Sequence, residues 1–108
     1  MECRRHHLLL GPLADVKQVD LWGVGQGGKP WIRWLKENEI QIRTLIDVNP
    51  RKVGKTIAGT RVIGPAEVGH SDGVMMLVAV GAAGARKKIE DFASQLGYVT
   101  GRDLWFVA

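Results

Sequence analysis

The stretch VDLWGVGQGGKP, residues 19–30, decides the expected fold. Its first four residues form a short, mostly apolar run, which favours a buried β-strand. Glycines follow at once, and Pro30 then suits the first turn of a helix, where its missing N–H would have no intrahelical partner. We therefore expect a strand at 19–22, a glycine turn at 23–28 and a helix from about 29 to 38.

The glycine turn matches the pattern G-x-G-x-x-G between a strand and a helix, which is the context that this phosphate-binding motif requires. Gly23 would permit the tight turn, Gly25 would let a phosphate approach the backbone, and Gly28 would let the helix pack closely on the strand. The helix N-terminus adds free N–H groups and a partial positive charge. The whole turn, with Gln26 and Gly27, is therefore a candidate nucleotide-binding site.

Asp47 strengthens this interpretation, since it lies 19 residues after Gly28 at the end of a second apolar run. In dinucleotide-binding folds, an acid near this distance accepts hydrogen bonds from the ribose hydroxyls. Its charge also disfavours a ribose 2′-phosphate, although Arg51 and Lys52 follow closely and weaken that preference. The alternative is that the glycines serve only the turn and its packing, and that Asp47 merely begins the turn before Pro50.

The rest of the chain alternates short apolar runs with amphipathic segments. The unbroken apolar run within residues 73–80 suits a central parallel strand that is covered on both faces. Further strands are expected at 42–47, 60–63 and 104–107, with a helical turn near 66–68 and a second helix from about 85 to 96. This alternation predicts a three-layer α/β domain of the Rossmann-like class, with a mostly parallel five-stranded sheet in the order 3-2-1-4-5.

In that order, strands 1 and 4 are neighbours whose connections leave in opposite directions, and ligands bind at such a switch point. A second small-residue turn, residues 81–84, would lie across the crevice from the first turn. Gly81 and Gly84 therefore join the candidate site. Arg86, in the first turn of the second helix, would meet a phosphate or carboxylate there; the alternative is a solvated helix residue.

Length and composition limit the possible functions. The 108 residues fit one domain, which we expect at 19–108 after a leader or linker at 1–18. The net charge of +4 suits a small anionic ligand and is too weak to indicate nucleic acid. Cys3 is the single cysteine, so no internal disulfide is expected, the residue spacing indicates no metal site, and a cytoplasmic setting follows. The only apolar run in the leader has three leucines, too few to span a membrane.

With these residues in view, the sequence resembles a module of bacterial polysaccharide-assembly enzymes. The resemblance covers about residues 8–108, through LWGVGQGG at 21–28, IDVNP at 46–50, GK at 54–55, VIGP at 62–65 and DLWFV at 103–107. The chain is similar to the nucleotide-sugar-binding N-terminal domain of sugar O-acyltransferases. It looks closest to the C-terminal appendage of some family 2 glycosyltransferases.

This resemblance implies a nucleotide or nucleotide-sugar ligand at Gly23, Gly25, Gly28 and Asp47. It also implies that catalysis belongs to another domain of the same parent chain. The acyltransferase modules typically carry a histidine in the glycine turn, where this chain has Gln26 and Gly27. That departure argues against a direct role in acyl transfer.

Three functions are consistent with these features. The first is a non-catalytic nucleotide or nucleotide-sugar binding module that serves a bacterial glycosyltransferase. The second, which rests on the same glycine pattern and Asp47, is the NAD(H)-binding domain of an oxidoreductase or redox sensor. The third is a structural interaction domain with a vestigial site, suggested by the small size and by tryptophans at 22, 31, 34 and 105, which we expect in a core or interface. The sequence leaves the ligand, the parent enzyme and the oligomeric state open.

Overall fold

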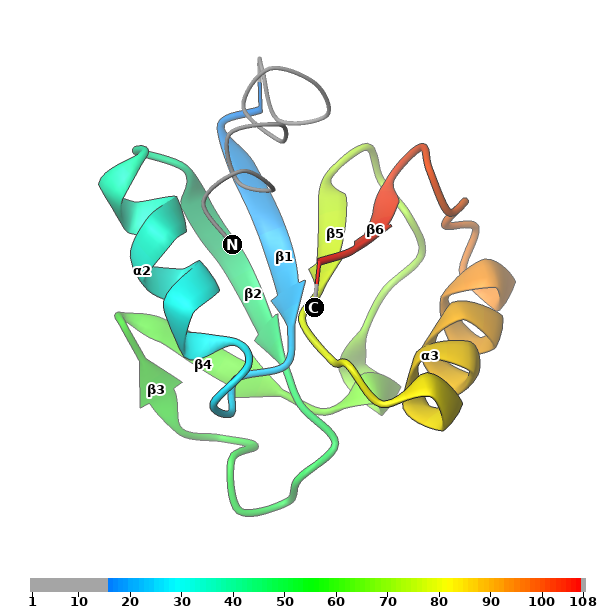
Figure 1. The fold of residues 1–108 in the computed structure, drawn as a ribbon, viewed down its shortest axis with the longest axis horizontal. Coiled ribbons are helices and arrows are strands. Elements are labelled where there is room, and N and C mark those ends of the chain that lie inside the picture. The colour runs from blue at the N-terminus through cyan, green and yellow to red at the C-terminus, as the bar shows by residue number, and fades with distance from the viewer. Residues whose placement is uncertain (1–15, 108) are drawn as a thin grey trace.

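The central feature is a six-stranded sheet with one helix against each of its faces (Figure 1). The computed structural model describes residues 16–107, so Cys3 and most of the expected leader lie outside the described residues. The strands are β1 (Gln18–Trp22), β2 (Gln41–Ile46), β3 (Thr56–Ile57), β4 (Thr60–Ile63), β5 (Met75–Val78) and β6 (Leu104–Phe106). The helices are α2 (Lys29–Glu37) and α3 (Ala83–Gln95), and a short 3-10 turn covers Pro65–Glu67.

The strand order is β3-β4-β2-β1-β5-β6. The five strands from β4 to β6 are parallel to their neighbours and follow the predicted order 3-2-1-4-5. The expected count of five is wrong, because β3 adds a sixth strand that pairs antiparallel with β4 at the edge. The sheet is therefore mixed, and the addition lies away from the β1–β5 switch point.

The extra strand exists because the chain makes a two-residue hairpin between β3 and β4. Its two turn residues, Ala58 and Gly59, both have positive φ angles, of 54° and 82°. Such a turn matches the twist of the two strands that it joins, and Asn-Gly is its favoured sequence. Alanine gives no hairpin signal at the first turn position, so the sequence offered little to mark a strand only two residues long.

Replacing Ala58 by asparagine should stabilise this hairpin. Asparagine tolerates the left-handed backbone better than alanine does, and we expect a gain of about 0.5–1 kcal/mol in the free energy of unfolding. The urea midpoint measures the gain. Ala66→Asn, at an exposed position with an ordinary φ angle, is the matched control. An equal shift of the midpoint in both variants would contradict the argument.

The core is divided between the two faces of the sheet, as alternating side chains require. Val19 and Leu21 of β1 pack on the α2 side, with Trp31, Trp34 and Leu35 of that helix. The opposite face joins Trp22, Ile46, Met76, Val78 and Leu104 to Ile89 and Ala93 of α3. The two clusters give the three layers that the sequence predicts, with a tryptophan-rich α2 on one side.

A buried carboxylate interrupts the apolar face under α3. Asp20 is 3% exposed, and Arg43 of β2 binds both of its oxygens, with Nε at 3.0 Å from Oδ1 and Nη2 at 2.7 Å from Oδ2. The same guanidinium donates through Nη1 to Asp72, at 2.7 Å, in the segment before β5. The two carboxylates hold the pKa of Arg43 above its usual value, and the guanidinium lowers the pKa of Asp72. Arg43 therefore ties the segment before β5 to the centre of the sheet.

Candidate functional site

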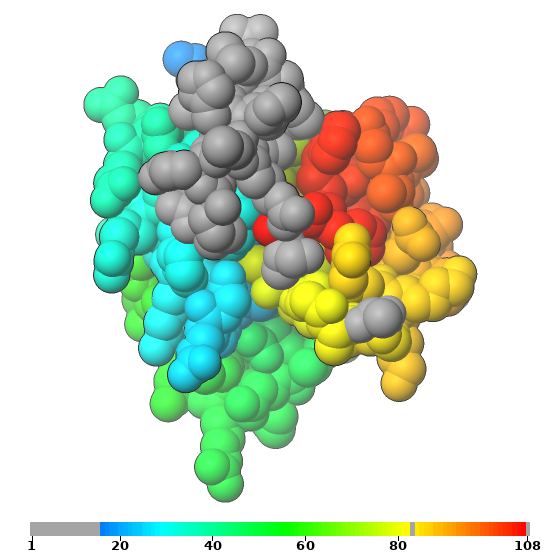
Figure 2. Space-filling model, viewed as in Figure 1, coloured from blue at the N-terminus to red at the C-terminus, as the bar shows by residue number. Residues whose placement is uncertain are grey.

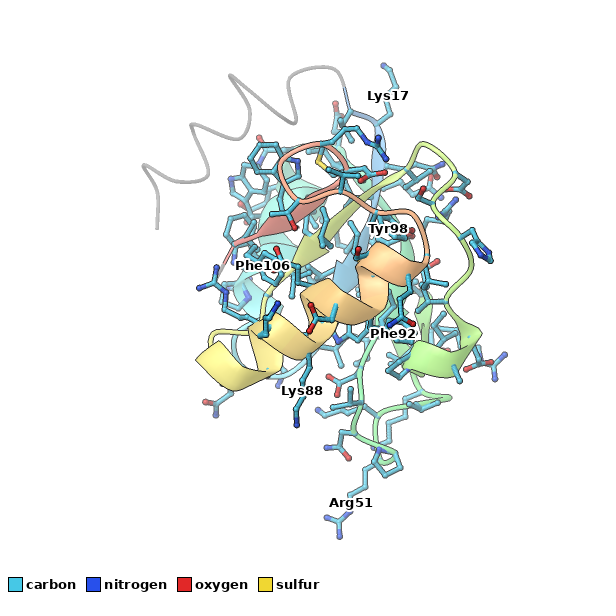
Figure 3. The ribbon with its side chains drawn as sticks, turned by 90° about the vertical axis from the view of Figure 1, so that its right-hand side faces the viewer. Lys17, Arg51, Lys88, Phe92, Tyr98 and Phe106 are labelled. Carbon is cyan, nitrogen blue, oxygen red and sulfur yellow. The ribbon has the colours of Figure 1, made fainter. Side chains whose placement is uncertain are left out.

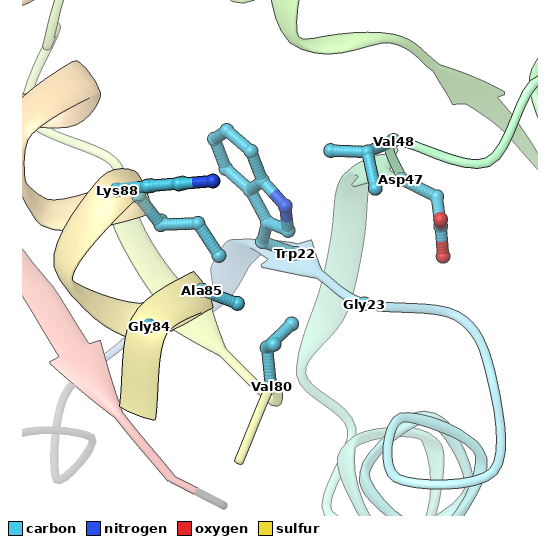
Figure 4. Close-up of a pocket in the computed structure, with 9 residues that line it drawn as sticks. Trp22, Gly23, Asp47, Val48, Val80, Gly84, Ala85 and Lys88 are labelled. Atoms are coloured by element: carbon cyan, nitrogen blue, oxygen red, sulfur yellow. The ribbon is translucent and has the colours of Figure 1, made fainter. Parts of the chain in front are cut away.

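A pocket of about 460 Å³ opens where β1, β2 and β5 end. We call it the switch-point pocket, because β1 leads to α2 on one face of the sheet and β5 leads to α3 on the other (Figure 1). This is the place where open α/β sheets bind their ligands. The described residues that line it are Trp22, Gly23, Asp47, Val48, Val80, Gly84, Ala85, Lys88 and Ile89 (Figure 4).

The glycine turn has the geometry that its sequence predicts. Gly23 has a φ angle of +108°, which favours glycine, and its N–H donates to the Ile46 carbonyl at 2.8 Å. A methyl group at Gly28 would overlap the Gly23 carbonyl group, with only 2.7 Å between the methyl and the carbonyl carbon. The roles expected for these two glycines, in the tight turn and in the close packing of the helix start, are both confirmed.

The middle of the turn is open. A methyl group added at Gly25 would meet no atom within 4 Å. Among residues 16–107, the N–H groups of Gly25, Gln26 and Gly27 find no acceptor, whereas those of Gly28 and Lys29 both donate to the Gly25 carbonyl. Three backbone donors in a row are therefore left for water or for an anion. Their use by a phosphate stays a prediction.

Asp47 lies one residue beyond β2 and is bonded to the glycine turn. Its Oδ2 accepts from the Val24 N–H at 3.1 Å, and its Oδ1 accepts from the Asn49 N–H at 2.8 Å. Asp47 thus begins the turn before Pro50, as the alternative to ribose binding requires. Its hydrogen bond to Val24 also links that turn to the glycine turn. Each carboxylate oxygen can accept about two hydrogen bonds, so capacity for a ribose hydroxyl remains.

The second small-residue turn contributes only part of what was expected. Gly84 lines the switch-point pocket, but Gly81 is exposed and does not. Arg86 lies over the ring of Phe106, with its guanidinium carbon 4.9 Å from the ring centroid, and its Nε is covered without a partner. It lines a separate hollow between α3 and β6, to which Thr100 and Phe106 contribute. The structure therefore brings Gly23, Asp47 and Gly84 together in one pocket. The predicted site residues that do not line it are Gly25, Gln26, Gly27, Gly28, Gly81 and Arg86.

Sequence reasoning missed Lys88 as a pocket residue. It follows Gly84 by four positions, and residues at this spacing share one face of a helix. That spacing was the available signal, because Gly84 was already a candidate. Figure 4 shows the Lys88 side chain extending into the pocket beside the Trp22 indole.

Trp22 was expected in a core or an interface, and it forms the floor of the pocket as well. The residue is 3% exposed, and its ring meets Phe92 edge to face, with 5.8 Å between the ring centroids. Most of the lining is apolar, from Trp22, Val48, Val80, Ala85 and Ile89, whereas Asp47 and Lys88 supply the charges. Ligand sites commonly combine apolar walls with a few polar groups in this way. The walls suit a flat aromatic ring, and the charged groups suit hydroxyls and an anion.

Comparisons with known proteins define the class of fold. No protein-family model matches the sequence, and no curated protein sequence matches it. Similar solved structures include the crystal structure of RSP, a Rex-family repressor, and that of RSP in complex with β-NADH. The first has a TM-score of 0.62 at 15% identity, over 98% of this chain and 59% of that chain. The second has a TM-score of 0.62 at 14% identity, over 99% of this chain and 61% of that chain.

At such low identity these likenesses show the fold, which is a Rossmann-like α/β domain. The chain spans less than two thirds of the length of either solved structure. The resemblance to modules of glycosyltransferases and sugar O-acyltransferases stays a prediction.

Two further expectations concern metals and membranes. Within residues 16–107, histidine, cysteine and acidic side chains form no group of three or more that could hold a metal ion. None of the helices in this described range is long and apolar enough to cross a membrane. His6 and His7 lie outside the described residues, as does Cys3.

Proposed function

We propose that this domain binds a nucleotide in the switch-point pocket, and we place NAD(H) first among the candidate ligands. The observation that carries the proposal is the 3.1 Å hydrogen bond between the Val24 N–H and Asp47. It joins the carboxylate at the end of β2 to the glycine turn at the end of β1. A hydroxyl acceptor thereby borders the apolar pocket, and the free N–H donors of residues 25–27 follow Gly23 in the same turn, outside the lining of the pocket.

Each part of a nucleotide would find a partner suited to its chemistry. The base would lie against the apolar side chains of Val48, Val80 and Ala85. The ribose hydroxyls would donate to the remaining lone pairs of Asp47. A phosphate would accept from the N–H groups at residues 25–27, where the absence of a side chain at Gly25 lets it approach.

Two arguments favour NAD(H) over a nucleotide-sugar. The carboxylate of Asp47 suits a ribose with free hydroxyls and would repel a 2′-phosphate, so NAD(H) is preferred to its 2′-phosphorylated form. In addition, RSP shares this fold, and its crystal structure is of a complex with β-NADH. A UDP-sugar remains the second candidate, because the sequence resembles nucleotide-sugar modules. We assign the domain a binding role, with any catalysis in another domain of a parent chain.

An NMR titration of the isotopically labelled protein tests the proposal. NAD⁺, NADH, UDP and a UDP-sugar would each be added, and shifts should localise to the glycine turn at 23–28, Asp47 and Gly84. NADH or NAD⁺ should bind more tightly than UDP and the UDP-sugar. The reverse order would favour the nucleotide-sugar function. Absence of shifts at millimolar ligand, where binding would be weaker than about −4 kcal/mol, would contradict both.

Gly25→Val is the variant that tests the site without disturbing the fold. The new side chain enters open space at an ordinary φ angle, but it blocks the approach of a phosphate to the turn. We expect NADH affinity to fall by at least about tenfold, since charge-assisted hydrogen bonds to the phosphate are lost. The urea midpoint should stay within experimental error. Gly69→Val, at another open glycine with an ordinary φ angle and outside this pocket, should change neither quantity.

A further inference from the structure

Lys88 is the one cation among the described residues that line the switch-point pocket. Its side chain comes from the second turn of α3 and extends into the pocket beside the Trp22 indole, as Figure 4 shows. Lys88 is an exposed residue, and Figure 4 shows its ammonium group across the Trp22 indole from Gly23 and Asp47.

The neighbouring cations of α3 are engaged elsewhere. Arg86 lies over the Phe106 ring, on the side of α3 that meets β6, and Lys87 forms an ion pair with Asp91, with 3.0 Å between Nζ and Oδ1 (Figure 3 shows α3 and Phe106). Within residues 16–107, Lys88 has no carboxylate within ion-pair distance. The only carboxylate that lines the pocket, Asp47, is held by the N–H groups of Val24 and Asn49.

We infer that Lys88 contacts a phosphate oxygen of the bound nucleotide, so that the site selects phosphorylated ligands over the bare nucleoside. This inference rests on the proposed function and adds a residue to the predicted set. An ammonium group has three donors and no acceptor, and the lining of the pocket offers Lys88 no ion-pair partner, so water satisfies this exposed group until an anion replaces it. A phosphate brought near the glycine turn supplies both the acceptors and the opposite charge.

Calorimetric titrations of ADP and adenosine separate this role from a general packing role. In the wild type, ADP should bind more tightly than adenosine. Lys88→Gln should weaken ADP binding by about tenfold and leave adenosine binding within about twofold, because only the charged contact is removed. Lys88→Arg, which keeps the charge, should retain most of the ADP affinity. Arg86→Gln, two positions earlier on the same helix, should change ADP affinity by less than about twofold.

The outcomes distinguish this inference from the proposed function. If Lys88→Gln weakens ADP and adenosine equally, Lys88 contacts the nucleoside or shapes the wall, and the inference is overturned. If ADP binding is lost in Gly25→Val but unchanged in Lys88→Gln, the proposed function stands and the inference alone fails. If neither ADP nor NADH binds the wild type, both fail together.

Discussion

Replacing Arg43 by methionine is expected to lower the free energy of unfolding by about 3 kcal/mol. The substitution leaves the Asp20 carboxylate, whose side chain is 4% exposed, without the two hydrogen bonds that it receives from the guanidinium. Removing one partner of a buried ion pair costs about 3–5 kcal/mol. We take the lower end because the Arg43 side chain is 34% exposed and water reaches the site. Urea denaturation followed by circular dichroism measures the loss.

Two variants separate the buried half of this cluster from its exposed half. Asp72→Asn removes the charge of the exposed partner, whose side chain is 53% exposed, and should lower the urea midpoint far less than Arg43→Met does. The double variant Asp20→Asn with Arg43→Met removes the buried charge and should recover much of the loss. Equal losses in Asp72→Asn and Arg43→Met would show that the pairing with Asp20 is not the dominant interaction.

Gly28→Ala should be about as damaging, for a steric reason. The φ angle of Gly28 is −88°, which any residue adopts, so backbone strain plays no part. The added methyl group would overlap the carbonyl group of Gly23 and lie 3.2 Å from the Val24 Cα. These obstacles are backbone atoms at the junction of β1 and α2, and they cannot rotate away. We expect a loss of about 3 kcal/mol, the upper part of the range for overpacking, visible as a lower urea midpoint.

Gly25→Ala is the matched control for this prediction. The glycine lies three residues earlier in the same turn, and its new methyl group would meet nothing within 4 Å. Its stability should equal or slightly exceed that of the wild type, because alanine restricts the unfolded chain more than glycine does. A destabilisation of both variants by the same amount would mean that the turn requires glycine for its backbone conformation rather than for its packing.

The fold was predictable because short segments of the sequence identify the central strands, and these strands determine the order of the whole sheet. The apolar run at β5 and the strand, turn and helix of residues 18–37 each mark a central element, and their alternation leaves few possible sheet orders. The β3–β4 hairpin was not predictable by the same means. Its two paired residues are too few for an alternating pattern, and Ala58 adopts a backbone conformation that alanine rarely takes.

The candidate site was predictable only in part. A sequence motif identifies single residues, whereas a pocket depends on which residues the folded chain brings together. The glycine spacing predicted the turn after β1, and the position of Asp47 predicted the carboxylate after β2 that is bonded to this turn. Arg86 and Lys88 are both basic and lie on the same helix, and only the packed structure shows which of them lines the pocket. Arg86 instead lies over the aromatic ring of Phe106, on the side of α3 that meets β6.

The switch-point pocket is assembled from three segments that are distant in the chain. Gly23, Asp47 and Lys88 meet because β1 pairs with both β2 and β5, so the pocket disappears whenever that pairing is lost. A molecule seated there binds the native state and has no site on the unfolded chain. It therefore shifts the folding equilibrium by mass action, by about 2.7 kcal/mol at a concentration one hundred times its dissociation constant. Any compound that binds in this pocket should therefore raise the melting temperature of the domain, so a thermal-shift screen can find the ligand before its identity is known.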